Sequence, residues 1–174
     1  MPPAATSSSA CSPEAAWITW YGCGGWQRVF DFGDAIGPDT YREANTTLYL
    51  TPQSLTSNVM LGAYKRADQP AIGEARASST TPLETGVMVQ VVLVVDKNTS
   101  VMALYKNGRL EGSTSFTGSL SMLNDVNNWL GRSQYTIDPS FNGIFHDFRI
   151  YDAPLSATAV EVSYSGGPDA PFLN

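Results

Sequence analysis

Basic residues are scarce in this sequence, and their scarcity argues against two classes of partner. The 174 residues include 10 Lys and Arg against 16 Asp and Glu, which gives a formal net charge of −6. Proteins that bind nucleic acids or anionic membrane surfaces carry clustered positive charge. We therefore expect no nucleic-acid partner. The acidity instead suits neutral partners or a bound cation.

Long apolar runs are also missing. The longest, VMVQVVLVV at 87–95, is interrupted by Gln90 and closed by Asp96, whereas a membrane-spanning helix needs about 20 apolar residues in succession. We expect no membrane insertion, and the β-branched composition of this run predicts a buried strand. The opening segment MPPAATSSSA lacks the basic and apolar regions of a signal peptide.

Cysteine and histidine are rare, which limits redox and catalytic chemistry. Cys11 and Cys23 flank the segment EAAWITWY at 14–21, which as a straight strand would hold their Cα atoms about 25–35 Å apart. Two reduced thiols are therefore favoured over an internal disulfide, which would require the chain to fold back. The single histidine, His146, has no nucleophile beside it in the sequence, so a His-dependent triad is difficult to build.

The sequence does contain many short apolar segments separated by turn signals. Strands are expected at 14–21, 26–33, 46–51, 58–64, 72–78, 87–95, 101–106 and 109–113, with a loop at 34–45. A helix is expected only at 155–164, where Ser156 is a candidate N-cap. This pattern predicts an all-β fold, a two-sheet antiparallel β-sandwich or jelly roll with one short C-terminal helix.

The length favours one domain, flanked by segments of different composition. Residues 1–13, rich in Pro, Ala, Thr and Ser, are interpreted as a linker or a segment added for expression. The domain itself is expected over 14–165, and the closing 166–174 is interpreted as a tail.

The stretch at 126–152 carries the longest alternating pattern. In its second half, Phe141, Phe145, Asp147 and Arg149 alternate with a second set that includes Phe148. Apolar groups on both faces predict a strand in the middle of a sheet that packs against a second sheet. Arg28, Arg132 and Arg149 all lie in aromatic-rich strands, and we interpret them as members of ion pairs or as stacked guanidinium groups.

Three segments together resemble a known family. They are WQRVFDFG at 26–33, VVLVVD followed by ALYKNGRLEGS within 91–113, and NNWLGRSQYTIDPSFNGIFHDFRIYDAPLS at 127–156. In this order they resemble the laminin-G-like jelly-roll domains of the concanavalin A-like lectin/glucanase superfamily, over residues 14–164. The resemblance implies a carbohydrate-binding or adhesive accessory module of a larger protein, secreted or at the cell surface.

The same superfamily contains glycoside hydrolases, but this sequence does not carry their carboxylates. Their glucanases place Glu-x-Asp-x-x-Glu, or a close variant, on one strand, and no such string occurs here. Asp31 and Asp34 are three residues apart, which in a strand puts them on opposite faces. We therefore expect a non-catalytic protein.

Sugar binding needs an aromatic platform beside polar groups. Tyr21 and Trp26 flank a glycine-rich loop, and Tyr135 and Asp138 lie in a second polar segment, so these four residues are the candidate ligand-binding residues. The alternative is that aromatic side chains fill the core. We assign Trp17, Phe30, Phe32, Phe145 and Phe148 to the core, because they occupy strand positions of a sandwich.

A structural calcium ion is a second hypothesis. Calcium takes six to eight oxygen ligands, and loops at the rim of a jelly roll can supply them. The candidate ligands are Asp34 and Asp147, with Asp138 a weaker third. The alternative is that Asp147 pairs with Arg149 or Arg132 and that Asp34 caps a turn.

Two functions of different classes follow from the sequence. The first is a lectin-like module whose partner is a glycan or polysaccharide. The second is a structural or protein-protein adhesion module that contacts other domains of a parent protein and binds no sugar. The fold does not decide between them.

Overall fold

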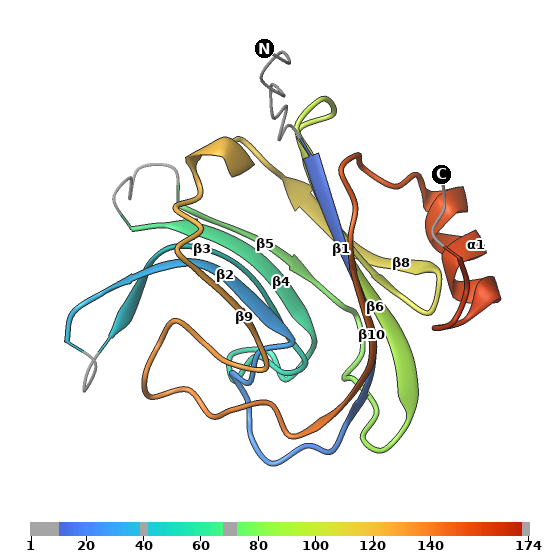
Figure 1. Cartoon of the computed structure of the whole chain (residues 1–174), viewed down its shortest axis with the longest axis horizontal. Coiled ribbons are helices and arrows are strands. Elements are labelled where there is room, and N and C mark those ends of the chain that lie inside the picture. The colour runs from blue at the N-terminus through green and yellow to red at the C-terminus, as the bar shows by residue number, and fades with distance from the viewer. Residues whose placement is uncertain (1–10, 39–41, 68–72, 172–174) are drawn as a thin grey trace, which may run out of the picture.

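The computed structural model describes residues 11–38, 42–67 and 73–171, which form two five-stranded antiparallel sheets and one α-helix (Figure 1). The first sheet has the order β10-β1-β6-β7-β8 and the second the order β5-β4-β3-β2-β9. The predicted β-sandwich is therefore confirmed. The strands are β1 Cys11–Trp20, β2 Phe30–Ile36, β3 Glu43–Thr51, β4 Leu61–Arg66, β5 Glu74–Ser78, β6 Met88–Asp96, β7 Val101–Lys106, β8 Arg109–Ser115, β9 Asn127–Leu130 and β10 Gly143–Ile150.

The main core lies between the two sheets. Ile18, Leu93 and Leu104 from the first sheet and Phe30 and Leu48 from the second are at most 1% exposed. Burial of these facing side chains is the main stabilising contribution, because it removes apolar surface from water.

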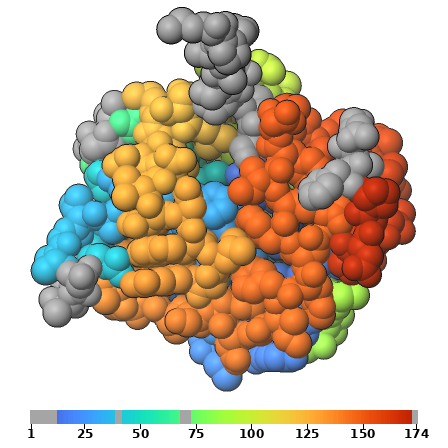
Figure 2. All heavy atoms as spheres, in the orientation of Figure 1, coloured from blue at the N-terminus to red at the C-terminus, as the bar shows by residue number. Residues whose placement is uncertain are grey.

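One open side of the sandwich is closed by the segment between β8 and β10. Phe116, Leu120, Leu123 and Phe141 from this segment pack against the main core. In the space-filling view this segment, in yellow and orange, spreads over the side of the molecule that faces the viewer (Figure 2).

Helix α1, Ala157–Gly166, covers the outer face of the first sheet. Val160 packs there with Val92 and Tyr105, and Tyr164 stacks on Trp17 with ring centroids 5.6 Å apart. The predicted N-cap is confirmed, since the Ser156 side chain accepts a hydrogen bond from the Ala159 amide. Neither this helix nor any other in the described residues has the length and hydropathy that a membrane span requires.

The prediction for the strand at 141–151 is wrong in two respects. β10 is an edge strand, because β1 and β6 take the central positions of the first sheet. A register shift opposite Trp17 and Ile18 leaves His146 with no residue directly opposite it on β1. This bulge turns Phe148 to the same side as Phe145, so both pack on the main core.

Several strand boundaries differ from the predictions. β1 begins at Cys11, so residues 11–13 belong to the first sheet and not to a linker. β2 begins at Phe30 rather than Trp26, since Trp26 has a positive φ of 61° that a strand does not accommodate. The expected loop at 34–45 is shorter, because β2 continues to Ile36 and β3 begins at Glu43.

The two cysteines differ in what the structure describes of them. Cys23 is an exposed, free thiol. The Cys11 side chain lies outside the described part of the structure, although its backbone opens β1.

Candidate functional site

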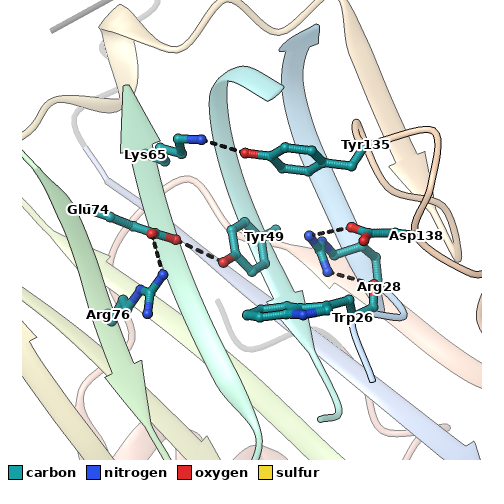
Figure 3. A pocket seen from close by; sticks show the side chains of 8 residues that line it. All are labelled: Trp26, Arg28, Tyr49, Lys65, Glu74, Arg76, Tyr135 and Asp138. Carbon is teal, nitrogen blue, oxygen red and sulfur yellow. Dashed lines mark hydrogen bonds and ion pairs between the residues drawn. The ribbon is translucent and has the colours of Figure 1, made fainter. Parts of the chain in front are cut away.

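A cavity of about 280 Å³ opens on the outer face of the second sheet, on the side away from the main core (Figure 3). It is bounded by β3, β4 and β5, by the loop before β2 and by the loop between β9 and β10. The lining residues are Trp26, Arg28, Tyr49, Lys65, Glu74, Arg76, Tyr135 and Asp138.

Strand alternation explains why side chains from three strands face this cavity. Leu48 and Leu50 point into the core, so Tyr49 between them points outward. Ala75 and Ala77 likewise face the core, which turns their neighbours on β5 toward the cavity. The small alanines let β5 pack closely while its charged residues remain on the outer face.

Arg28 fixes one wall of the cavity. It is 2% exposed and donates from Nε to Asp31 at 3.3 Å, from Nη2 to Asp138 at 2.9 Å and from Nη1 to the Trp26 carbonyl at 2.7 Å. Its guanidinium carbon lies 4.2 Å from the centroid of the Tyr49 ring. Arg28 therefore connects the two loops that border the cavity.

Asp31, which is buried beneath the cavity lining, anchors the loop between β9 and β10. It is fully buried and accepts hydrogen bonds from the Thr47 hydroxyl and from the Gln134 amide at 2.9 Å. Burial raises the pKa of Asp31, and the charge of Arg28 together with these hydrogen bonds opposes that shift. These contacts hold the loop that carries Tyr135 and Asp138.

The opposite wall is a chain of three hydrogen-bonded side chains. The Tyr49 hydroxyl donates to Glu74 Oε1 at 2.9 Å, and Arg76 Nη2 donates to Glu74 Oε2 at 2.7 Å. Burial and the negative charge of Glu74 raise the pKa of Tyr49, so the phenol keeps its proton and remains a donor. Both oxygens of Glu74 are therefore engaged.

Lys65 and Tyr135 close the top of the cavity in the view of Figure 3. Lys65 Nζ donates to the Tyr135 hydroxyl at 2.5 Å and lies 5.2 Å from the centroid of its ring. Trp26 lies along the bottom of the same view, below Tyr49 and Arg28. The cavity thus combines three aromatic rings with five charged side chains.

The structure brings together three of the four candidate ligand-binding residues. Trp26, Tyr135 and Asp138 line the cavity. Tyr21 is 49% exposed and lies outside the lining.

Arg28 was predicted only as a member of an ion pair or stack, and four lining residues on β3, β4 and β5 were not predicted at all. Their signal is the alternation of outward and core-facing positions, as in the EARAS sequence of β5. The four are Tyr49, Lys65, Glu74 and Arg76.

Asp34 and Asp147, the candidate calcium ligands, do not fit one shared site. Asp34 lies in the second sheet and accepts hydrogen bonds from Thr46, Asn45 and Asn124. Asp147 lies in the first sheet. In the described parts of the chain, no group of three or more His, Cys, Asp or Glu side chains is placed to hold a metal ion. Calcium stays a prediction without a ligand set.

The interpretation of the three arginines is confirmed. Arg28 forms the two ion pairs described above. Arg132 stacks over the Trp129 ring at 4.2 Å, and Arg149 pairs with Asp147 at 2.5 Å.

Comparison with known families agrees with this architecture. Residues 5–161 match the Laminin_G_3 model, described as the concanavalin A-like lectin/glucanases superfamily. The chain belongs to this family. No curated protein matches the sequence.

Solved structures of similar fold come from several proteins. Domain 4 of AbnA, a GH43 extracellular arabinanase from Geobacillus stearothermophilus in complex with arabinotriose, has a TM-score of 0.65 at 19% identity, over 91% of this chain and 68% of that chain. The CBM40 of Ruminococcus gnavus IT-sialidase, bound to α2,3-sialyllactose, has a TM-score of 0.68 at 13% identity, over 89% of this chain and 83% of that chain. A SAP-like pentraxin from Limulus polyphemus has a TM-score of 0.57 at 16% identity, over 93% of this chain and 73% of that chain. At these identities the similarity concerns the fold.

Proposed function

We propose that this family member is a non-catalytic carbohydrate-binding module and that it binds glycan in the cavity on the outer face of the second sheet. The observation that carries the proposal is the combination of three aromatic side chains, Trp26, Tyr49 and Tyr135, with charged groups in one cavity. Aromatic rings provide contact surface for the C–H faces of a sugar, and charged and hydroxyl groups bind its hydroxyls.

The size of the cavity agrees with a small oligosaccharide segment. Its volume of about 280 Å³ lies just below the range for small-molecule sites, about 300–1,000 Å³. One or two sugar units therefore fit inside, and further units would extend over the neighbouring strands.

Two structural relatives support the class of ligand. AbnA domain 4 and the R. gnavus CBM40 were each solved with an oligosaccharide. Modules of this kind are attached to larger proteins that act on glycans. We extend this arrangement to the present chain, as an accessory domain of a secreted or surface protein.

The carboxylates in the cavity argue for binding without hydrolysis. Glycoside hydrolysis requires one carboxylic acid that gives a proton and one carboxylate that acts as base or nucleophile. Glu74 is bonded to Tyr49 and Arg76, and Asp138 to Arg28 and Ser133. Neither is arranged as a free proton donor.

A glycan array followed by calorimetric titration with the strongest hit tests the proposal. Trp26→Ala removes one aromatic wall, and we expect it to weaken glycan binding by about tenfold or more. Tyr21→Ala is the matched control, because Tyr21 is an exposed aromatic residue outside the cavity lining. Melting temperatures of both variants separate loss of binding from loss of folding.

Two outcomes would overturn the proposal. Absence of binding to every glycan on the array would favour a protein-protein adhesion module. A loss of binding in Tyr21→Ala with retention in Trp26→Ala would move the site to another surface.

Repeating the array and the melts with calcium and with chelator tests the calcium hypothesis, since a bound ion raises the melting temperature.

A further inference from the structure

The charged side chains that line the cavity are not all paired with one another. Three cations and two anions face it, and two of the cations have carboxylate partners inside the site. Arg28 pairs with Asp138 and also with buried Asp31, and Arg76 pairs with Glu74. Among the described residues, no carboxylate lies within ion-pair distance of Lys65, the third cation.

The partner that Lys65 would ordinarily take is engaged elsewhere. Lys65 on β4 and Glu74 on β5 are directly opposite each other in the antiparallel register, a position from which opposite charges commonly interact. Glu74 instead uses one oxygen for Tyr49 and the other for Arg76. Figure 3 shows the Lys65 side chain directed away from Glu74, toward Tyr135.

The contact between Lys65 and Tyr135 leaves hydrogen-bond donors for a ligand. An ammonium group has three N–H donors, and one of them is used for the Tyr135 hydroxyl. Because that hydroxyl oxygen accepts from Lys65, its own proton is available to donate elsewhere. Two donors from different elements thus lie side by side at the top of the cavity, and one of them carries a full positive charge.

Arg76 adds donors on the same side of the cavity. Its side chain is 46% exposed, and its hydrogen bond to Glu74 uses only Nη2. The remaining guanidinium N–H groups are donors without acceptor capacity. Glu74 lies between Arg76 and Lys65 in Figure 3, so these donors would serve a different part of a bound ligand from the group at Lys65.

We propose that the cavity selects a sugar that bears a carboxylate, which binds Lys65 and the Tyr135 hydroxyl. This inference rests on the proposed function and names its ligand class. A carboxylate accepts from both donors and supplies a counter-charge that no described carboxylate supplies to Lys65, whereas a neutral hydroxyl supplies no charge. Uronic acids within a polysaccharide and terminal ulosonic acids both carry this group.

The net charge of −6 does not prevent such binding. Charges separated by more than about 8 Å are largely screened at physiological ionic strength. A contact made inside the cavity is screened less, so the ammonium group of Lys65 can attract a bound carboxylate despite the negative net charge.

Two matched pairs of probes test this inference by calorimetric titration. The first pair is 3′-sialyllactose and lactose, and the second is a trigalacturonate and its methyl ester. We expect the acid in at least one pair to bind about tenfold more tightly than its neutral partner. The pair that responds identifies the source of the carboxylate.

Substitution of Lys65 connects the preference to the residue. Lys65→Met keeps most of the apolar stem and removes the charge. The acid and its neutral partner should then bind with about equal affinity. Lys65→Arg should keep the preference because it keeps the charge. Lys97→Met, in the exposed turn between β6 and β7, is the matched control and should leave both affinities unchanged.

The possible failures are distinguishable. Equal affinity for acid and neutral probes, or an acid preference that persists in Lys65→Met, overturns the carboxylate inference while the proposed function stands. Absence of binding to all four probes and to the glycan array overturns both.

Discussion

Asp34 connects three separate parts of the chain through one side chain. Its carboxylate accepts from the Thr46 amide at 2.8 Å and the Thr46 hydroxyl at 2.6 Å, both on β3. It also accepts from Asn45 at 3.0 Å and from Asn124, in the segment between β8 and β9, at 2.9 Å. Partial burial raises the pKa of Asp34, but these hydrogen bonds outweigh it and hold the pKa below the ordinary value of 3.8.

This lowered pKa predicts a pH-dependent contribution to stability. The unfolded chain binds the Asp34 proton first as the pH falls, so the contribution is complete above about pH 4 and is lost as the pH falls through the folded-state pKa. Asp34→Asn should therefore reduce the free energy of unfolding by about 1–2 kcal/mol at neutral pH, and the difference should narrow below about pH 4. Urea unfolding at several pH values measures it.

Asp125→Asn is the control for this prediction. Asp125 is an exposed carboxylate next to Asn124 in the sequence, so its substitution should change stability little at any pH. If the free energies of unfolding of Asp34→Asn and the unsubstituted protein differ by the same amount at every acid pH, Asp34 is not the source of the pH dependence.

At the scale of elements, β2 depends on one glycine. Gly33 has a φ of 153° and pairs with Thr47 on β3 and Asn127 on β9. A Cβ at this position would overlap the Thr46 carbonyl oxygen. Gly33→Ala should therefore force β2 and β3 apart and cost about 2–3 kcal/mol or more, measured by denaturant unfolding.

Substitution of a second glycine measures the cost of backbone strain without the steric clash that an added Cβ would cause at Gly33. Gly86 has a φ of 75°, and a Cβ added there would have no other atom within 4 Å. Gly86→Ala therefore carries only the cost of its backbone conformation, about 1–2 kcal/mol. Equal losses for the two variants would mean that the close approach of β2 and β3 contributes nothing.

The same elements show what local pattern reveals and what it misses. The strand at 101–106 was predicted with its bounds, because apolar residues and turn signals define it locally. The faces of β10 were not, since the bulge at His146 shifts the register against β1. A bulge depends on the partner strand, and strict alternation along one segment does not reveal it.

The candidate site was predicted in part for a related reason. Trp26, Tyr135 and Asp138 were found as aromatic and polar residues in loops, but nothing local indicates that they meet. Arg28 and Asp138 are 110 positions apart in the chain, and their ion pair depends on the sheet order. The contribution of Lys65 likewise depends on the pairing of β4 with β5 and on the loop that carries Tyr135.

At the scale of the whole molecule, packing and the proposed binding occupy different faces of the second sheet. The inner face carries the main core, and the outer face carries the cavity. Neither sheet buries its inner face without the other, so we expect the two sheets to unfold together. Phe148 is the place to test this, because it extends from β10 of the first sheet to two rings of the second.

The Phe148 ring lies 6.0 Å from Phe30 and 6.1 Å from Phe32, both in edge-on geometry. Phe148→Ala should lower the free energy of unfolding by about 3 kcal/mol, with far-UV circular dichroism and tryptophan fluorescence reporting one shared transition. Ile150→Ala, at a 56% exposed position of the same strand, is the control and should cost much less. Separate transitions would show that the sheets unfold independently. Under conditions where it is folded, Phe148→Ala should retain glycan affinity. The Phe148 ring packs on the inner face of the second sheet, whereas the cavity lies on the outer face of that sheet.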